Sequence, residues 1–215
     1  MDVSKLPNHH PVPWNTTFEP MALPAMFARS TRAAPDAPLL HFLGRSYTYD
    51  ELFRDAQAFA QALIRRGIAA GDRVGLFLPN VPSYVVAYYG AMMAGAVVVN
   101  FSPLYSVEEL EQQVADSGTR LLVTVDVPEL YATAEKVLRG SALRTLVVSS
   151  LAEMLPTFKG LAMRVLGRKK IARVSHDESV LAWREFLTRG REGNAALPEV
   201  DPHSLALLQY TGGAT

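Results

Sequence analysis

The sequence predicts an α/β fold in which helices cover a mostly parallel sheet and an antiparallel hairpin lies near the N-terminus. Short apolar runs of strand length alternate with stretches of helical periodicity between residues 38 and 150. The runs are apolar at nearly every position, which is typical of strands buried on both faces of a parallel sheet. Hydrophobic residues make up 49% of the chain and charged residues 20%, a composition typical of a folded globular protein.

The first elements follow from turn and capping signals. We assign residues 1–37 to a proline-rich arm and a helix. Two short runs, 39–42 and 46–49, flank a Leu-Gly-Arg turn and predict the hairpin. Thr48 followed three residues later by Glu51 is a capping-box pattern, which predicts that a helix begins here.

The remaining elements of the core alternate between strand and helix. Ser106 with Glu109 forms a second capping box, and Gly118 is the expected end of the helix that follows. The other expected elements are strand 74–78, helix 80–95, strand 96–100, strand 120–125, helix 128–139 and strand 143–149. We take residues 38–150 together as the α/β core.

Positive charge is concentrated in residues 151–200, where the alternation of strand and helix breaks down. We assign this range to a basic amphipathic insertion and a connection. No acidic residue lies between Glu153 and Asp177. The basic residues that we expect to face a membrane surface are Lys159, Arg164, Arg168, Lys169, Lys170 and Arg173.

The insertion has an apolar side as well as a basic one. A helical wheel places its apolar residues on one arc, opposite Arg164 and Arg168. The residues of this arc are Leu155, Phe158, Leu161, Ala162, Val165 and Leu166. Such a helix is typical of peripheral contact with an anionic membrane, here through residues 155–173. The alternative is a surface helix that packs its apolar face on its own domain.

Residues 201–215 are expected to form a last strand, at 205–210, and the start of a loop that binds phosphate. The loop residues assigned to phosphate are Thr211, Gly212, Gly213 and Thr215. Glycines let the main chain approach a phosphate closely, while main-chain N–H groups and threonine hydroxyls donate hydrogen bonds to it. The pattern is neither GxxxxGK[ST] nor GxGxxG, so an ordinary turn is the alternative.

Composition excludes several other functions. The 21 lysines and arginines balance the 21 aspartates and glutamates, so the net charge does not favour a nucleic-acid partner. The absence of cysteine excludes disulfides and thiolate metal sites. We find neither a secretory signal nor an apolar stretch of membrane-spanning length, and we therefore expect a cytoplasmic protein. We assign no catalytic residue and no metal ligand, since the adjacent His9 and His10 lack spaced partners.

Several stretches carry a resemblance to a known family. The segment LALLQYTGGAT is similar to the opening of the phosphate-loop signature of the adenylate-forming acyl-CoA synthetases, although Ala214 stands where a hydroxyl residue is usual. Residues 47–123 are similar to the N-terminal portion of these enzymes, including GDRV, the PN pair, the AG pair and NFSPLYS. Together with WREFLTRGRE, these stretches most resemble bacterial long-chain fatty acid CoA ligases.

The resemblance implies that residues 1–215 are an incomplete N-terminal domain that binds ATP and the acyl group. Such enzymes use ATP and Mg²⁺ to turn a fatty acid into an acyl-adenylate, and then transfer the acyl group to coenzyme A. Thr211, Gly212, Gly213 and Thr215 would contact the β- and γ-phosphates of ATP. The basic insertion resembles a segment of those ligases, which are peripheral membrane proteins, so we expect contact with the inner face of the cytoplasmic membrane. A homodimer is a further expectation.

We expect the 215-residue chain alone to be inactive and to hold no cofactor tightly. In the family, the elements for adenine, Mg²⁺, the acyl tunnel and coenzyme A lie mostly beyond Thr215. Two alternatives stay open. One is a non-catalytic relative that binds a membrane or another subunit. The other is an adenylating enzyme for a different carboxylic acid, such as a medium-chain or aryl acid.

Overall fold

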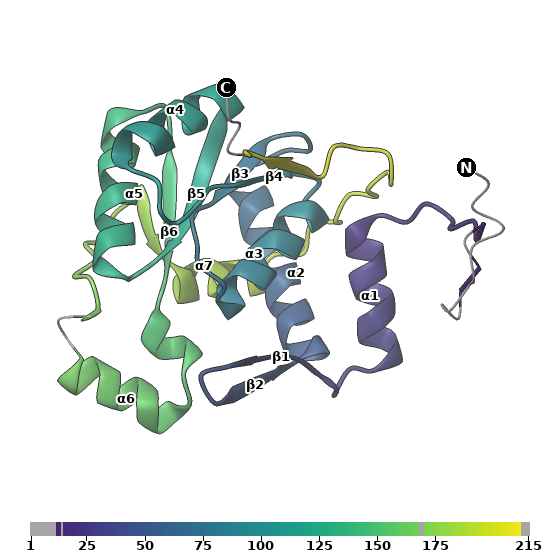
Figure 1. The fold of residues 1–215 in the computed structure, drawn as a ribbon, viewed down its shortest axis with the longest axis horizontal. Helices are drawn as coiled ribbons and strands as arrows, with labels where there is room; N and C mark the ends of the chain where they lie inside the picture. Colours follow the sequence, from purple (N-terminus) through teal and green to yellow (C-terminus); the bar gives the residue numbers. More distant parts are fainter. Residues whose placement is uncertain (1–11, 14, 168–169, 212–215) are drawn as a thin grey trace.

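A computed structural model describes residues 12–13, 15–167 and 170–211 of the chain. The helices are α1 (Leu23–Ala33), α2 (Tyr49–Arg65), α3 (Pro82–Met93), α4 (Val107–Ser117), α5 (Pro128–Gly140), the short 3-10 helix η2 (Leu151–Met154), α6 (Thr157–Leu166) and α7 (Trp183–Arg191). The strands are β1 (Pro38–Phe42), β2 (Arg45–Thr48), β3 (Arg73–Leu76), β4 (Val97–Asn100), β5 (Thr119–Val125), β6 (Thr145–Ser149), β7 (Val180–Ala182) and β8 (Leu207–Gln209). Their arrangement is drawn in Figure 1.

The main sheet has six strands in the order β7-β6-β5-β3-β4-β8, and every neighbouring pair is parallel. β1 and β2 form a separate antiparallel sheet of two strands. The predicted α/β fold, with a parallel sheet and an N-terminal hairpin, is therefore confirmed. Because β5 lies next to β3 rather than next to β4, the chain reverses its direction across the sheet after β4.

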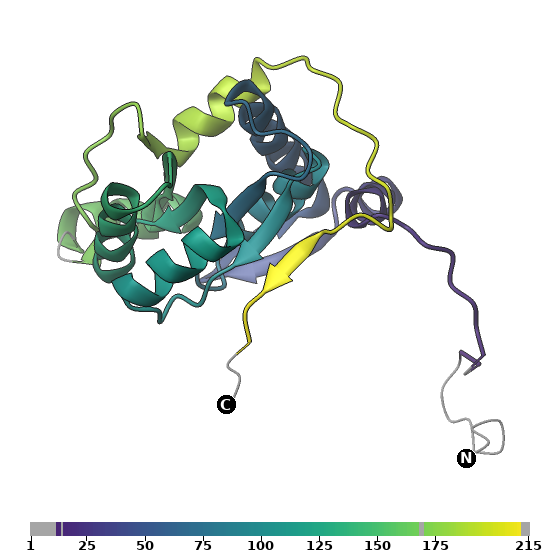
Figure 2. The same cartoon turned by 90° about the horizontal axis from the view of Figure 1, so that it is seen from above.

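Helices cover both faces of the sheet. Figure 2 shows α2 and α7 on one side of the strands, with α4 and α5 on the other. Alternate residues of β5 divide between the two cores, because Leu121 packs in the cluster with α2 and α3, whereas Leu122 packs in the cluster with α4 and α5. Both leucines are almost fully buried. The near-continuous apolar strands of the sequence thus reflect burial on two faces.

Both predicted capping boxes are formed. The Thr48 side chain accepts a hydrogen bond from the Glu51 N–H at 3.2 Å, and the Glu51 carboxylate accepts one from the Thr48 N–H at 2.9 Å. Ser106 and Glu109 make the same reciprocal pair at the start of α4. Gly118 ends α4 in the left-handed region with φ 63°, which glycine adopts without steric cost.

The range 151–200 holds more regular structure than the sequence indicated. It contributes β7 to the edge of the sheet beside β6, and α7 packs against α2. The close approach of α7 requires Gly190, because a Cβ at this position would overlap the main-chain carbonyl of Ala58. The interpretation of this range as insertion and connection alone was therefore incomplete. A strand of three residues is too short to show a periodicity.

Candidate functional site

The last strand begins the candidate phosphate loop at the carboxyl edge of the sheet. β8 pairs in parallel with β4, with Asn100 opposite Gln209. The chain therefore leaves β8 at the edge where open α/β sheets bind ligands, beyond the carboxyl ends of their strands. Thr211 is exposed just after the strand. The other predicted phosphate-binding residues lie outside the described residues: Gly212, Gly213 and Thr215.

Tyr210 anchors the chain immediately before Thr211. Its hydroxyl donates to Asp116 Oδ2 at 2.6 Å and lies 3.3 Å from the main-chain oxygen of Gln113, both on α4. Its ring stacks on Phe101, with centroids 6.2 Å apart and planes at 18°. Burial and the neighbouring Asp116 carboxylate raise the pKa of the Tyr210 phenol to about 12. Tyr210 thus packs its ring against the sheet and fixes its hydroxyl on α4.

A second anchor joins β8 to α3 through side chains alone. Tyr84 donates its hydroxyl hydrogen to Asn100 Oδ1 at 2.9 Å, and Asn100 Nδ2 donates to Gln209 Oε1 at 3.0 Å. Burial raises the pKa of the Tyr84 phenol, so the phenol stays protonated as a donor. The three residues are far apart in the sequence, and no motif connected them. The bonds from Tyr210 to α4 and from Gln209 to Asn100 hold the end of β8 on both sides. They therefore fix the position from which Thr211 continues the chain.

A buried carboxyl group lies at the same edge of the sheet. Asp126 follows β5 and is 6% exposed, and its Oδ1 accepts the N–H of Leu151 at 2.7 Å. Burial raises the pKa of Asp126, while the hydrogen bond from Leu151 acts in the opposite direction. Asp126 also lines a cavity of about 280 Å³ together with His176 and Arg184. The described part of the chain contains no group of three or more potential metal ligands.

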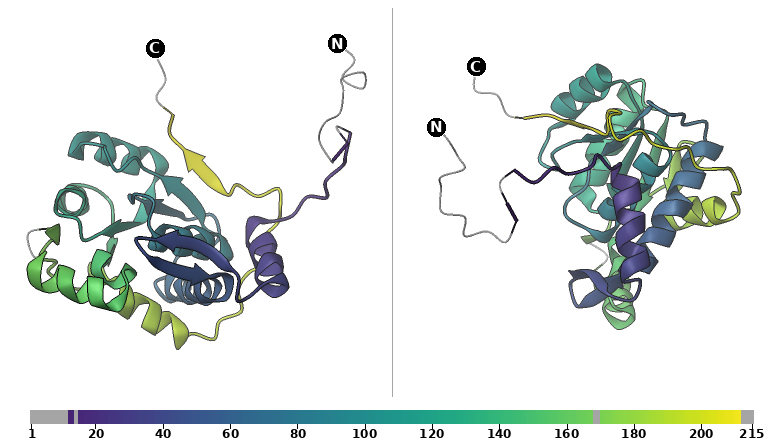
Figure 3. Two further views of the ribbon diagram at one scale, coloured as in Figure 1. Left: turned by 60° about the horizontal axis from the view of Figure 1, so that its bottom comes forward. Right: turned by 90° about the vertical axis from the view of Figure 1, so that its right-hand side faces the viewer.

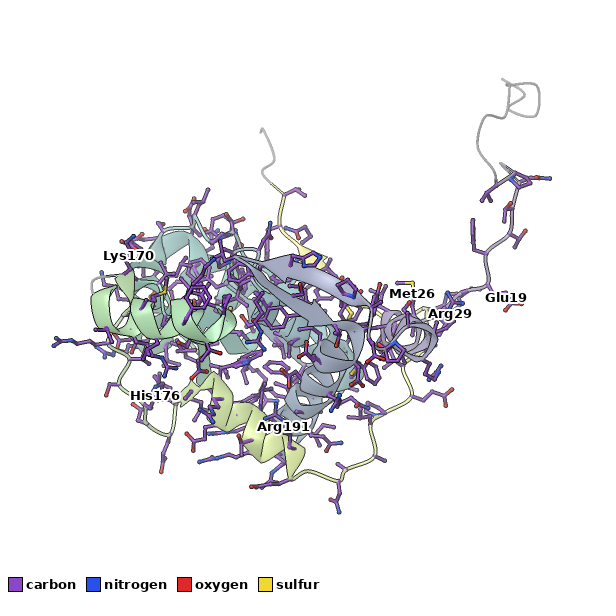
Figure 4. The ribbon with its side chains drawn as sticks, turned by 90° about the horizontal axis from the view of Figure 1, so that it is seen from below. Glu19, Met26, Arg29, Lys170, His176 and Arg191 are labelled. Atoms are coloured by element: carbon purple, nitrogen blue, oxygen red, sulfur yellow. The ribbon has the colours of Figure 1, made fainter. Side chains whose placement is uncertain are left out.

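The basic residues of the predicted membrane segment divide into two groups. Lys159 Nζ donates to the main-chain oxygen of Leu43 at 3.1 Å, and Arg164 pairs with Glu153 at 2.9 Å. These two cations therefore contact the protein itself. Lys170 and Arg173 are exposed beyond the helix, and Figure 4 shows Lys170 near the end of α6. Arg168 and Lys169 lie outside the described residues.

The apolar arc of this segment faces away from the domain. Phe158 is 71% exposed, Leu161 64% and Val165 57%. The side of α6 that contacts the protein instead carries Gly160, where a Cβ would overlap the carbonyl of Ala152. Leu155 precedes α6 and is buried, so it does not belong to the exposed arc. The alternative in which α6 packs its apolar face on its own domain is therefore wrong for the described chain.

Among the described residues, no helix has the length and apolar character needed to cross a membrane. The exposed apolar face of α6 belongs to a surface helix that is only 10 residues long.

The chain belongs to the AMP-binding enzyme family, whose sequence profile matches residues 27–215. It is 34% identical over 214 residues to a long-chain-fatty-acid–CoA ligase of Escherichia coli O6:H1, covering 97% of this chain and 38% of that relative. A ligase of the same description from Bacillus subtilis is 30% identical over 213 residues, covering 98% of this chain and 36% of the relative. The chain thus spans little more than a third of these curated relatives.

Solved structures show the same fold. A long-chain-fatty-acid-CoA ligase from Archaeoglobus fulgidus superposes with a TM-score of 0.69 at 21% identity, covering 93% of this chain and 36% of that one. The anthranilate CoA ligase AuaEII, solved with anthranoyl-AMP, gives a TM-score of 0.69 at 19% identity, with 89% and 32% covered. The fold is therefore that of part of an adenylate-forming enzyme.

Proposed function

We propose that the polypeptide carrying this chain is a long-chain fatty acid:CoA ligase. The observation that carries the proposal is the identity of 34% to a curated ligase of this kind along 97% of the chain. The geometry agrees, because β8 delivers Thr211 to the carboxyl edge of the sheet between two anchors. Residues 1–215 would then be the incomplete N-terminal domain of that enzyme.

In this proposal ATP and Mg²⁺ convert the fatty acid carboxylate into an acyl-adenylate, and coenzyme A accepts the acyl group. The role of this chain is to hold the phosphates. Thr211 would donate its hydroxyl to a phosphate oxygen, and Gly212, Gly213 and Thr215 would continue the cradle. Donors fixed in place before the reaction stabilise the charge that develops on the departing pyrophosphate. Tyr210 and Gln209 would contribute by keeping the first donor in position.

The test is acid-dependent exchange between ATP and pyrophosphate, made on the longest natural polypeptide that carries this sequence. We expect exchange that is strongest with long acyl chains in a series from acetate to oleate. Exchange confined to medium-chain or aryl acids would show that the enzyme activates one of those acids in place of a long-chain fatty acid. A folded sample that gives no exchange with any acid would leave the non-catalytic binding protein as the function. The 215-residue chain alone should give no exchange.

We further propose that α6 brings the protein to the surface of an anionic membrane. The support is the exposed apolar side of Phe158, Leu161 and Val165, together with the exposed cations Lys170 and Arg173. Apolar residues inserted below the headgroups and basic residues at the surface act together in such contacts. Localisation at the inner face of the cytoplasmic membrane would follow.

Vesicle co-sedimentation of the longest natural polypeptide tests this contact. The double variant Phe158→Ser with Leu161→Ser should lose most binding to vesicles. The matched control is Leu104→Ser with Leu205→Ser, which removes two leucines that are 90% and 59% exposed away from α6. Equal binding by all three proteins would contradict the proposal. If the α6 variant instead changes the oligomeric state, or destabilises the fold, the face is covered by a second copy or by further chain.

A further inference from the structure

A depression lies between the β1–β2 hairpin, η2, α6 and α7, which all contribute residues to its walls. It consists of two hollows of about 250 Å³ and about 460 Å³, and both are lined by Arg45, Glu153 and Arg184. A third hollow, of about 280 Å³, also has Glu153 and Arg184 in its wall. We call this depression the arginine groove and define it by these three shared residues. Figure 3 shows the hairpin beside α6 in both of its views.

The acidic groups of the groove are already occupied. Glu153 pairs with Arg164 at 2.9 Å, and Asp55 pairs with Arg191 at 2.6 Å. The buried Asp126, in the third hollow, accepts the N–H of Leu151. Within the part of the chain that the structure describes, neither Arg45 nor Arg184 has a carboxylate partner. The two hollows that share Arg45 are lined by four arginines and two carboxylates, which leaves two positive charges in excess there, while Asp126 adds a negative charge in the third hollow.

The Arg45 guanidinium is held by contacts with its neighbours, whereas Arg184 is fixed through its main chain in α7. Arg45 lies over the ring of Tyr47, 4.3 Å from its centroid, and donates to the main-chain oxygen of Glu153 at 3.2 Å. Tyr47 is itself 7% exposed and donates its hydroxyl to the carbonyl of Met154 at 2.7 Å. Arg184 lies in the first turn of α7, which packs closely on α2. A guanidinium held as that of Arg45 is loses little freedom when it forms paired hydrogen bonds to a phosphate or carboxylate.

The rim of the groove is apolar where α6 forms it. Leu161 lines the larger hollow and is also 64% exposed, so it reaches from the groove to the outer surface. Leu43, at the tip of the hairpin, is 59% exposed and meets α6 through the hydrogen bond from Lys159. A ligand that fits this surface carries an anionic group at one end and apolar chains at the other. The polar side chains in the larger hollow, including Thr157 and Arg164, favour a headgroup larger than a bare carboxylate.

We propose that the arginine groove binds the phosphate of an anionic phospholipid headgroup, with Arg45 and Arg184 as its ligands and Leu43 and Leu161 toward the acyl chains. This inference rests on the membrane contact proposed for α6 and adds a specific site to it. The hairpin lies more than a hundred residues before α6 in the sequence. In this proposal it forms part of the protein surface that contacts the membrane. Nonspecific attraction would depend on total charge, whereas this site depends on two named arginines.

The first test compares two double variants of the longest natural polypeptide that remove the same charge. The groove variant, Arg45→Gln with Arg184→Gln, removes the two guanidinium groups that are proposed to bind the phosphate. Arg29→Gln with Arg144→Gln is the control, since both arginines are exposed and Arg29 lies on α1, at the end of the molecule away from Lys170 in Figure 4. On phosphatidylcholine vesicles that contain phosphatidylglycerol, we expect the groove variant to bind roughly thirtyfold more weakly. The control should change by less than about threefold. Equal losses in the two variants would overturn the proposal.

The second test separates the groove from the membrane contact of α6. Short-chain phosphatidylglycerol, kept below its micelle concentration, is titrated into each protein and followed by calorimetry. The comparison variant here is Phe158→Ser with Val165→Ser, because these two exposed residues line none of the three hollows. Lipid binding that the groove variant loses and this variant keeps supports the site even if vesicle binding fails. Inorganic phosphate or oleate that binds as tightly as the lipid, with the same dependence on Arg45 and Arg184, would overturn the headgroup assignment. No lipid binding by the unaltered protein, verified as folded by circular dichroism, would overturn the site altogether.

Discussion

Helices α2 and α6 are both amphipathic, yet they use their apolar faces in opposite ways. In α2, Leu52 is 2% exposed and Phe59 and Leu63 are fully buried, whereas Phe158 and Leu161 of α6 are 71% and 64% exposed. A helical period shows that apolar residues share a face, but it does not show what covers that face. The burial shows that α2 belongs to the domain core, while the apolar face of α6 is left uncovered by the described chain.

The largest expected difference in stability between α2 and α6 comes from truncating one phenylalanine in each helix. We expect Phe59→Ala to lower the free energy of unfolding by about 3–5 kcal/mol, because it opens a cavity next to Trp183 and Phe186. Phe158→Ala should change it by less than about 0.5 kcal/mol, since little of its ring is buried. Urea unfolding of both variants measures the two values. Similar losses would mean that α6 is packed as tightly as α2.

The two glycines at helix contacts should show a smaller contrast of the same kind. A Cβ at Gly190 would overlap the Ala58 carbonyl, and one at Gly160 would overlap the Ala152 carbonyl. Gly190→Ala should cost about 2–3 kcal/mol of unfolding free energy, because α7 and α2 are both held in the core. Gly160→Ala should cost less than about 1 kcal/mol, because α6 lies at the periphery and can shift. Urea unfolding measures both losses of unfolding free energy. Equal losses in the two variants would contradict the view that α6 is held less tightly than α7.

The first turns of α2 and α6 also differ, because only α2 begins with a side-chain cap. The expected effect on the free energy of unfolding is smaller than for the glycines. Thr48→Ala removes the reciprocal capping box of α2 and should cost about 1 kcal/mol of unfolding free energy. α6 has no side-chain cap, so Thr157→Ala is the matched change at its start and should be nearly neutral. Thermal unfolding of the two variants provides the check. A larger cost at Thr157 than at Thr48 would contradict the view that α6 depends little on local structure.

The last prediction is an effect of pH and concerns Tyr210, whose hydroxyl bonds to α4 while its ring packs on Phe101. Its pKa is raised to about 12 in the fold, compared with about 10 in an unfolded chain. The folded state thus favours the neutral phenol, and the resulting stability is fully present below about pH 10 and is lost as the pH rises toward 12. The difference in unfolding midpoint between the unaltered chain and Tyr210→Phe should shrink over this range. A difference that is independent of pH would contradict this assignment.

Local signals in the sequence were sufficient for most of the fold. The capping boxes at Thr48 and Ser106 and the glycine at Gly118 each act within a few residues, and the structure confirms all three. Strand ends were less certain, because β3 ends at Leu76 although Phe77 still donates its N–H to the carbonyl of Val123. Ladder hydrogen bonds of this kind depend on the neighbouring strand, which no local pattern describes.

The site was less predictable than the fold because tertiary contacts create it. The sequence indicated Thr211 through the loop that it opens, but it gave no signal for the link between Asn100 and Gln209. Arg45 and Arg184 stand in different segments, and only the packing of the hairpin near α7 brings them to one groove. The basic segment was recognised from its composition. That Lys159 and Arg164 would turn toward the protein could not be read from a helical wheel.

Oleate-dependent exchange between ATP and pyrophosphate by two variants at Thr211 tests the proposed phosphate loop and the proposed ligase function together. Removing one donor to a developing charge typically lowers the rate by about a hundredfold or more. We therefore predict that Thr211→Ala in the longest natural polypeptide loses exchange to about this extent, whereas Thr211→Ser, which keeps the hydroxyl, retains most of it. Exchange that is unchanged in Thr211→Ala would contradict the assignment of the phosphate loop. Absence of oleate-dependent exchange in the unaltered, folded protein would contradict the ligase function itself.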